Sequence, residues 1–236
     1  MPFLQSLQLG LHRPLRVREE IIASPQHPCR FAYVSDIHLR RGRSHLLGSQ
    51  VIAALKKAEP DVILLGGDLV DQASELDALR SLIVQMVGMA PVFAIPGNHD
   101  LAVGEPKVRE AVMESGAHWL QGRTESFVFR ERRFSISGPG GLILPDCDAA
   151  ILCAHNPSIW KHARHAGYDL VFAGHLHGCQ WVWFEAGGRL FPGAWFYPFN
   201  HRRQQSGSTH LLVSMGCSDL IPVRWGCPRE IILCIL

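Results

Sequence analysis

The sequence of 236 residues lacks several features, and each absence excludes a class of protein. No apolar run approaches the roughly 20 residues that are needed to cross a bilayer. The chain has no run of like charges, no low-complexity tract and no internal repeat. Its formal net charge is only +2, which gives no electrostatic case for a nucleic-acid or strongly acidic partner. These absences favour an ordinary globular protein.

Paired cysteines are also missing. The seven cysteines are scattered, odd in number and never spaced as C-x-x-C. This pattern argues against a disulfide framework and for a reducing, cytoplasmic location. Four of them lie in or beside apolar runs and are expected to be small buried side chains: Cys147, Cys153, Cys217 and Cys234.

The N-terminus lacks the basic start, continuous apolar core and cleavage site of a signal peptide. Leu4, Leu7 and Leu11 have roughly helical spacing, which predicts a short surface helix or arm. The alternative is a peripheral anchor at the inner face of a membrane. In that interpretation the leucines dip into the lipid and three arginines meet its anionic headgroups: Arg13, Arg16 and Arg18.

The first half of the chain alternates apolar strands with helical patterns. Strands are expected over 30–36, 61–68 and 90–100, and helices over 48–60, 74–89 and 105–116. Ser74 is a candidate N-cap of the second helix. This β-α-β-α-β order favours a layered sheet with helices on its faces.

The second half is richer in strands. Hairpins are expected over 126–138 and 179–191, single strands over 149–157, 168–178, 209–216 and 229–236, and a flexible polar loop over 200–208. No linker separates the two halves. We therefore expect one domain over residues 30–236, built on a sandwich of two sheets, with residues 1–29 as an arm and lead-in.

Polar side chains gather where these apolar runs end. They are Asp36, His38, Asp68, Asn98, His99, Asp100, His155, His175 and His177. Ligand sites of open α/β sheets collect at the carboxyl ends of strands, so residues far apart in sequence can meet there. These side chains fall into five groups, each at the end of one apolar run. Each group alone could be a turn that happens to contain histidine, but the five groups in this order are a highly specific pattern. Mixed nitrogen and oxygen donors suit Mn, Fe, Zn or Co better than Ca or Mg alone.

Two such cations about 4 Å apart can share a bridging hydroxide and hold both sides of a phosphoryl group. A carboxylate shared between them offsets their mutual repulsion. Asp68 suits this bridging position because Gly66 and Gly67 before it allow a close approach of backbone and metals.

Five segments resemble the motifs of the calcineurin-like metallophosphoesterases: SDIHL (35–39), GGDLVD (66–71), GNHD (97–100), AHNP (154–157) and GHLHG (174–178). The resemblance implies an α/β fold, a four-layer α/β/β/α sandwich of two mixed sheets, with two divalent metal ions, Mn before Fe, Zn or Co. It assigns one metal to Asp36, His38, Asp68 and His177, and the other to Asp68, Asn98, His155 and His175. It also implies that His99 is the general acid and that Asp100 orients it.

A narrower resemblance concerns the segment GHLHGCQ (174–180) and the C-terminal tail, which includes PVR (222–224). Both are similar to a bacterial subgroup of membrane-associated phosphodiesterases and UDP-2,3-diacylglucosamine hydrolases of lipid A biosynthesis. Cys179 replaces a glycine of that pattern, and Arg229 replaces a proline. Neither departure removes an implied metal ligand.

Substrate-binding residues are expected to be Asn98, His99, Arg40 and Arg41. The two arginines follow the first ligand pair, where a phosphate would arrive, although a solvated basic loop explains them equally well. The aromatic segment 180–199 has two interpretations. The alternation of Trp181 and Trp183 predicts a strand packed on the core, whereas residues 191–199 could form a wall or lid for an apolar part of the substrate.

The function expected from the sequence is hydrolysis of a phosphodiester or pyrophosphate bond by a metal-bridging hydroxide. The substrate would be a small or lipid-linked phosphate, with UDP-2,3-diacylglucosamine as the specific candidate. The alternatives are a generic phosphodiesterase or nucleotide phosphohydrolase, and a non-catalytic binding module on the same fold. Nucleic acid is not an expected partner.

Overall fold

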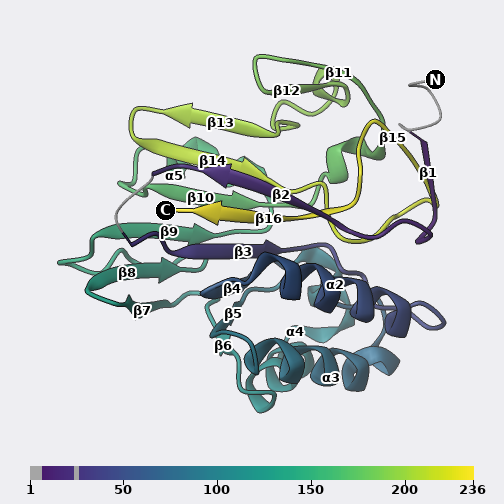
Figure 1. The fold of residues 1–236 in the computed structure, drawn as a ribbon, viewed down its shortest axis with the longest axis horizontal. Helices are drawn as coiled ribbons and strands as arrows, with labels where there is room; N and C mark the ends of the chain where they lie inside the picture. The colour runs from purple at the N-terminus through teal and green to yellow at the C-terminus, as the bar shows by residue number, and fades with distance from the viewer. Residues whose placement is uncertain (1–6, 24–26) are drawn as a thin grey trace.

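The computed structural model describes residues 7–23 and 27–236. Its first sheet has six strands, drawn as arrows in Figure 1. In spatial order they are β2 (Arg16–Ile21), β16 (Glu230–Ile235), β3 (Arg30–Val34), β4 (Val62–Leu65), β5 (Val92–Ala94) and β6 (His118–Trp119). β16 runs antiparallel to β3, and all other neighbours in this sheet are parallel.

The second sheet also has six strands. Their order is β13 (Arg203–Ser206), β14 (Thr209–Val213), β10 (Leu170–Ala173), β9 (Ala149–Cys153), β8 (Arg132–Ser137) and β7 (Thr124–Phe129). The two edge pairs are antiparallel and the three central pairs are parallel. Both sheets are therefore mixed, as the sequence predicted.

The two sheets pack face to face through a core of large apolar side chains. Tyr33 of β3 stacks on Phe172 of β10 with ring centroids 5.1 Å apart, and Phe31 meets Phe134 edge to face at 5.3 Å. Aromatic pairs in these geometries contribute beyond their buried area. This core joins the two halves of the chain into one unit.

Helices cover the outer faces. On the first sheet lie α2 (Ser44–Ala58), α3 (Leu76–Val87) and α4 (Asn98–Glu114), which Figure 1 shows together at the bottom of the molecule. On the second sheet the layer is thin, with only η2 (Pro157–Ile159) and α5 (Trp160–Ala163) among the described residues. The order of layers is helix, sheet, sheet, helix, which confirms the predicted fold class.

Smaller elements complete the fold. β1 (Leu7–Leu9) pairs with β15 (Val223–Trp225), and β11 (Val182–Ala186) forms a hairpin with β12 (Arg189–Pro192). Further short 3-10 turns are η1 (Ala73–Glu75), η3 (His177–Gln180) and η4 (Gly193–Trp195). The hairpin stands at the top of Figure 1, on the opposite side from the three long helices.

Residues 7–11 do not form the short helix that the leucines predicted. Leu4 lies outside the described residues, Leu7 belongs to strand β1, and Leu11 is buried against the helical face of the first sheet. Arg18 in β2 is also buried and pairs with Glu230 at 3.0 Å. Leu11 and Arg18 are therefore not available to a membrane surface. In the described part of the chain no helix has the length and apolarity that a bilayer crossing needs.

Three further expectations were wrong in detail. Ser74 does not cap α3: it lies inside η1, and its hydroxyl contacts the carboxylate of Glu75. The predicted loop over 200–208 contains strand β13, which pairs with β14. Trp181 and Trp183 are 40% and 58% exposed, because Val182 takes the inward position between them.

Candidate metal centre

The predicted site residues meet at one end of the two sheets. Asp36 and His38 follow β3, Asp68 follows β4, and Asn98, His99 and Asp100 form the first turn of α4 after β5. His155 follows β9 in the second sheet, and His175 and His177 follow β10. All five strands are parallel within their sheets, so their carboxyl ends bring these side chains together.

Five of the seven predicted metal ligands have a left-handed backbone. Their φ values are 56° at Asp36, 49° at His38, 52° at Asp68, 72° at His175 and 50° at His177. This conformation costs a non-glycine residue roughly 1–2 kcal/mol. Such strain is characteristic of functional sites, where it persists because the surrounding structure fixes it. Gly67 also has positive φ, and a Cβ there would collide with the backbone of Gly97.

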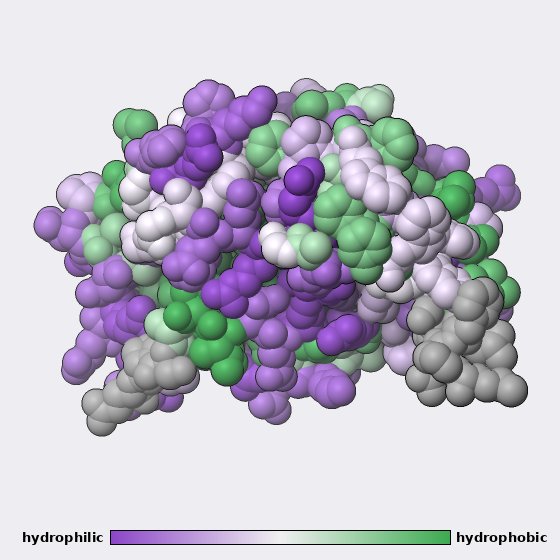
Figure 2. All heavy atoms as spheres, turned by 90° about the horizontal axis from the view of Figure 1, so that it is seen from above, coloured by the Kyte–Doolittle hydropathy of each residue, from purple (hydrophilic) through white to green (hydrophobic). Residues whose placement is uncertain are grey.

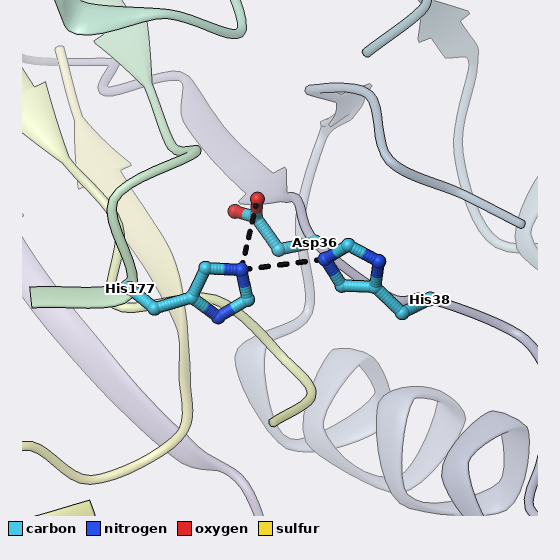
Figure 3. A group of neighbouring side chains, drawn as sticks. All are labelled: Asp36, His38 and His177. Atoms are coloured by element: carbon cyan, nitrogen blue, oxygen red, sulfur yellow. Dashed lines mark hydrogen bonds and ion pairs between the residues drawn. The ribbon is translucent and has the colours of Figure 1, made fainter. Parts of the chain in front are cut away.

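A first group of ligand atoms comes from Asp36, His38 and His177. Their donor atoms lie within 4.8 Å of one another. Figure 3 shows the His177 ring facing the other two side chains, with its Nε2 3.5 Å from Asp36 Oδ1 and 3.3 Å from His38 Nε2. All three side chains are buried.

A second group centres on the Nε2 atom of His155. It lies 3.3 Å from Asp68 Oδ2, 3.1 Å from Asn98 Oδ1 and 3.2 Å from His175 Nδ1. The same Asp68 oxygen is 3.7 Å from His38 Nε2 of the first group. Asp68 therefore lies between the two groups, which is the position predicted for a bridging carboxylate.

The Nδ1 atoms of three histidines point away from the two ligand groups, and their contacts show which ring nitrogen is left to bind a cation. His155 Nδ1 lies 2.8 Å from the Gly66 carbonyl, and His38 Nδ1 lies 2.7 Å from Asp71. His177 Nδ1 lies 3.1 Å from the Ser218 carbonyl, which also accepts from Arg224. Because these oxygens can only accept, the tautomer with the proton on Nδ1 satisfies each of them and would leave Nε2 to present its lone pair to a bound cation. Lone pairs and carboxylate oxygens thus converge, so the donor set fits divalent transition metals.

The charges of the site follow from burial and from the neighbouring groups. Burial opposes ionisation of Asp68, but the hydrogen bond and charge of His155 outweigh it and lower the pKa to about 2. Burial likewise opposes ionisation of Asp36, and His177, His155 and His38 together lower its pKa. Both carboxylates are therefore negative at neutral pH, as cation binding requires.

The predicted partnership of His99 with Asp100 is wrong. Asp100 is fully buried, and its carboxylate accepts backbone N–H groups from Gly97 at 2.8 Å, Leu69 at 2.9 Å and Val70 at 3.0 Å. It ties the start of α4 to the loop after β4. The His99 ring instead places Nδ1 2.9 Å from Asp71 Oδ1.

Asp71 is thus the site residue that the sequence analysis missed. It belongs to the GGDLVD segment, three residues after Asp68, and the signal was an acidic side chain at the end of that motif. A bridge between Leu39 and Val70 holds the loop after β4 against the loop after β3, which brings Asp71 to His38.

The two predicted substrate arginines follow His38 in the loop after β3. Arg40 is half-buried, and its guanidinium donates to the Asp219 carbonyl at 2.7 Å. Arg41 is exposed, and its backbone N–H contacts Gln72. Their role in binding phosphate stays a prediction.

Two hollows open beside the metal-ligand groups. The larger, of about 840 Å³, begins at Asn98 and His155 and extends toward Lys161 and His162. The smaller, of about 410 Å³, begins at His177 and extends toward Tyr197 and Ile221. His175 lines both hollows.

Comparison with known families agrees with this geometry. A model of the family described as calcineurin-like phosphoesterase matches residues 29–179. The matched segment includes the predicted site residues from Asp36 to His177.

Individual proteins are similar over most of the chain. The phosphodiesterase YaeI of Escherichia coli (strain K12) is 28% identical over 97% of this chain and 90% of its own length. Among solved structures, the protein TT1561 of Thermus thermophilus has a TM-score of 0.54 at 11% identity, covering 81% of this chain and 91% of that one. A dimetal phosphatase from Danio rerio has a TM-score of 0.51 at 12% identity, covering 82% and 89%. At such low identity the two solved structures show the shared fold alone.

Proposed function

The chain belongs to the calcineurin-like phosphoesterase family of metal-dependent phosphohydrolases, and from this premise we propose that its substrate is a phosphodiester. The observation that carries the proposal is the pair of ligand groups joined at Asp68 with His99 beside them. The similarity to a protein named as a phosphodiesterase supports a diester over a monoester. The complete set of ligand and acid residues argues against a non-catalytic binding module.

One metal ion would be held by Asp36, His38, Asp68 and His177, and the other by Asp68, Asn98, His155 and His175. The mixed nitrogen and oxygen donors suit Mn, Fe, Zn or Co, and manganese is the first choice by the resemblance to the family. When bound, the metal pair supplies Lewis acidity to the phosphoryl oxygens and lowers the pKa of the attacking water.

His99 would act on the leaving oxygen. Its Nδ1 faces Asp71, so the other ring nitrogen, Nε2, is free to give up a proton. Asp71 fixes the orientation of the ring. Because His99 is about one-third exposed, the ring can reach a substrate that enters from solvent.

UDP-2,3-diacylglucosamine, cleaved at its pyrophosphate, is the more specific candidate. It rests on the similarity of GHLHGCQ (174–180) and of the C-terminal tail to the bacterial subgroup. A peripheral position at the inner face of the membrane would accompany such a substrate. A generic diester without a lipid is the alternative.

The test compares three substrates on the Mn²⁺-loaded protein: bis(p-nitrophenyl) phosphate, p-nitrophenyl phosphate and UDP-2,3-diacylglucosamine. We expect the protein to hydrolyse bis(p-nitrophenyl) phosphate and UDP-2,3-diacylglucosamine faster than the monoester p-nitrophenyl phosphate. His99→Ala should lower kcat at least about 100-fold while the protein keeps its metals, as removal of a general acid does. Preference for the monoester, or full activity of His99→Ala, would contradict the proposal.

A further inference from the structure

We propose that Arg224 is a positioning residue for the first group of metal ligands, and that it acts through the backbone of Ser218. The inference rests on the metal centre of the proposed function but not on the choice of substrate. Arg224 belongs to PVR (222–224), to which the proposed function gives no role, and this segment lies outside the family-matched residues 29–179.

Arg224 is buried, which is unusual for a charged side chain. Hydrophilic residues cover much of the surface that Figure 2 shows, whereas Arg224 is only 1% exposed. Such a charge is almost never fully buried unless it is paired. Its guanidinium donates to the carboxylate of Asp219 and to the carbonyls of Met215 at 2.7 Å and Ser218 at 2.6 Å. Arg224 therefore fastens one short buried segment, residues 215–219, which we call the clamp segment.

The clamp segment contacts two ligands of the first group. The Ser218 N–H donates to the Asp36 carbonyl at 2.9 Å, and the Ser218 carbonyl lies 3.1 Å from His177 Nδ1. A Cβ at Gly216 would come within 2.9 Å of Asp36 Cβ and 3.0 Å of His177 Nδ1. The segment thus packs closely against both ligands, so a shift of its backbone would displace them.

A further contact reaches the loop of the third ligand. Arg40, two residues after His38, donates to the Asp219 carbonyl at 2.7 Å. Within the residues that the structure describes, no hydrogen bond joins the clamp segment to the side chains around His155 that form the second group. The clamp segment therefore supports one group of ligands and not the other.

The guanidinium also lies close to the ring of His177. Arg224 Nη2 and His177 Nδ1 are 3.3 Å apart, and both approach the Ser218 carbonyl. Binding of a cation at Nε2 requires the proton on Nδ1, and the two lone pairs of that carbonyl can then accept from both nitrogens. Partners of this kind fix the orientation of a ligand ring, and their loss costs about 10- to 100-fold in metal affinity. We therefore expect Arg224 to set the affinity for one metal ion.

The experiment titrates metal-free protein with Mn²⁺ alone in a calorimeter. Arg224→Lys keeps a positive charge but cannot reproduce the fork of guanidinium donors. Its affinity for one of the two Mn²⁺ ions should fall about 10- to 100-fold, while the affinity for the other stays within about threefold. His177→Ala identifies the ion of the first group, and Arg224→Lys should weaken the same ion.

Arg229→Lys is the matched control. Arg229 is also 1% exposed, and its side chain donates to the Cys217 carbonyl of the clamp segment at 3.2 Å, but it contacts neither Ser218 nor a metal ligand. This variant should lose stability in urea and keep both Mn²⁺ affinities. If Arg224→Lys does not fold, Asp219→Asn takes its place. It weakens the pairing of the guanidinium and should weaken the same ion to a smaller degree.

Selective weakening of one ion in Arg224→Lys, without such weakening in Arg229→Lys, supports the inference. Equal weakening of both ions, or the same selective loss in Arg229→Lys, overturns it. Unchanged or tighter binding in Arg224→Lys also overturns it, because the hold of Arg224 on Ser218 would then not matter to the metal.

The substrate is tested separately. If the unaltered protein binds two Mn²⁺ ions but hydrolyses no phosphodiester, the proposed function is wrong, and the titration still decides the role of Arg224. If the unaltered protein binds no Mn²⁺, the metal centre is contradicted and the inference is overturned with it.

Discussion

His38 and His99 direct their Nδ1 atoms at the same oxygen of Asp71, at 2.7 Å and 2.9 Å. Their rings lie edge to face with centroids 4.5 Å apart. One carboxylate therefore orients a predicted metal ligand and the predicted general acid together. A change at Asp71 should disturb both, whereas a change at Asp100 should not.

The first prediction separates these two carboxylates. Asp71→Asn should lower kcat by about 10- to 100-fold, as expected when the partner of a ligand histidine is lost. Asp100→Asn should instead lower the free energy of unfolding by about 1–3 kcal/mol, because its amide would turn a donor toward the Gly97 N–H. Steady-state kinetics and urea denaturation of both variants measure the two effects. A stable Asp100→Asn protein with lost turnover would restore Asp100 as the partner of His99.

A second prediction concerns metal binding. Metal-free protein should gain about 2.7 kcal/mol of stability for each metal ion bound at a concentration about 100 times its Kd. Asp68→Asn should lose most of this gain because Asp68 lies between both ligand groups. Asp77→Asn is the control, since that carboxylate is exposed on α3. Thermal unfolding with and without Mn²⁺ measures the difference, and equal gains in both variants would argue against a shared carboxylate.

The third prediction concerns Cys179, which occupies a position where the bacterial subgroup has glycine. Its φ of 56° is left-handed, a conformation that costs a side-chain-bearing residue roughly 1–2 kcal/mol. Cys179→Gly should therefore stabilise the fold by up to about 1 kcal/mol after the loss of packing. Cys179→Val should destabilise it, because a branched Cβ suits this backbone least. Urea denaturation measures the free energy of unfolding of both variants. A Cys179→Val protein more stable than the unaltered one would show that the left-handed backbone at this position is not costly.

A fourth prediction tests the buried ion pair between Arg18 of strand β2 and Glu230 of strand β16. Arg18 contacts Glu230 at 3.0 Å and donates to the Val213 carbonyl of the second sheet at 2.7 Å. Arg18→Met should cost about 3–5 kcal/mol because it leaves Glu230 buried without a counter-charge. The double variant Arg18→Met with Glu230→Met should recover much of this loss. Equal destabilisation in the single and double variants would show that the unpaired charge is not the cause.

The last prediction concerns thiol reactivity. Of the seven cysteines, all of which lie in the described part of the chain, only Cys147 and Cys179 are partly exposed. Burial raises the pKa of Cys29 to about 12 and that of Cys227 to about 11, so their thiolates are scarce at neutral pH. Near neutral pH an aromatic disulfide reagent should label at most these two partly exposed residues in the native protein and all seven after denaturation. Mass spectrometry identifies the labelled sites, and rapid native labelling of Cys153 would contradict the burial.

The sequence predicted the strands and the edge at which the candidate ligands gather for one physical reason. Apolar runs such as 61–68 and 168–178 end in polar turns, and parallel strands place such ends along one edge. The order of elements was sufficient for the layered fold. Segments with weak patterns failed: Leu7 and residues 203–206 of the polar run lie in strands because partner strands offer them hydrogen bonds.

Local pattern determined which residue types gather in this protein, and tertiary contact alone decided how they pair. Asp71 and Asp100 both lie close to ligands in the sequence, yet only the bridge between the loops at Leu39 and Val70 brings Asp71 to His38 and His99. Likewise Trp183 faces solvent because the β11–β12 hairpin forms a two-stranded sheet of its own without a covering layer. A strand pattern fixes the alternation of faces, but the elements packed on either side fix which face is buried.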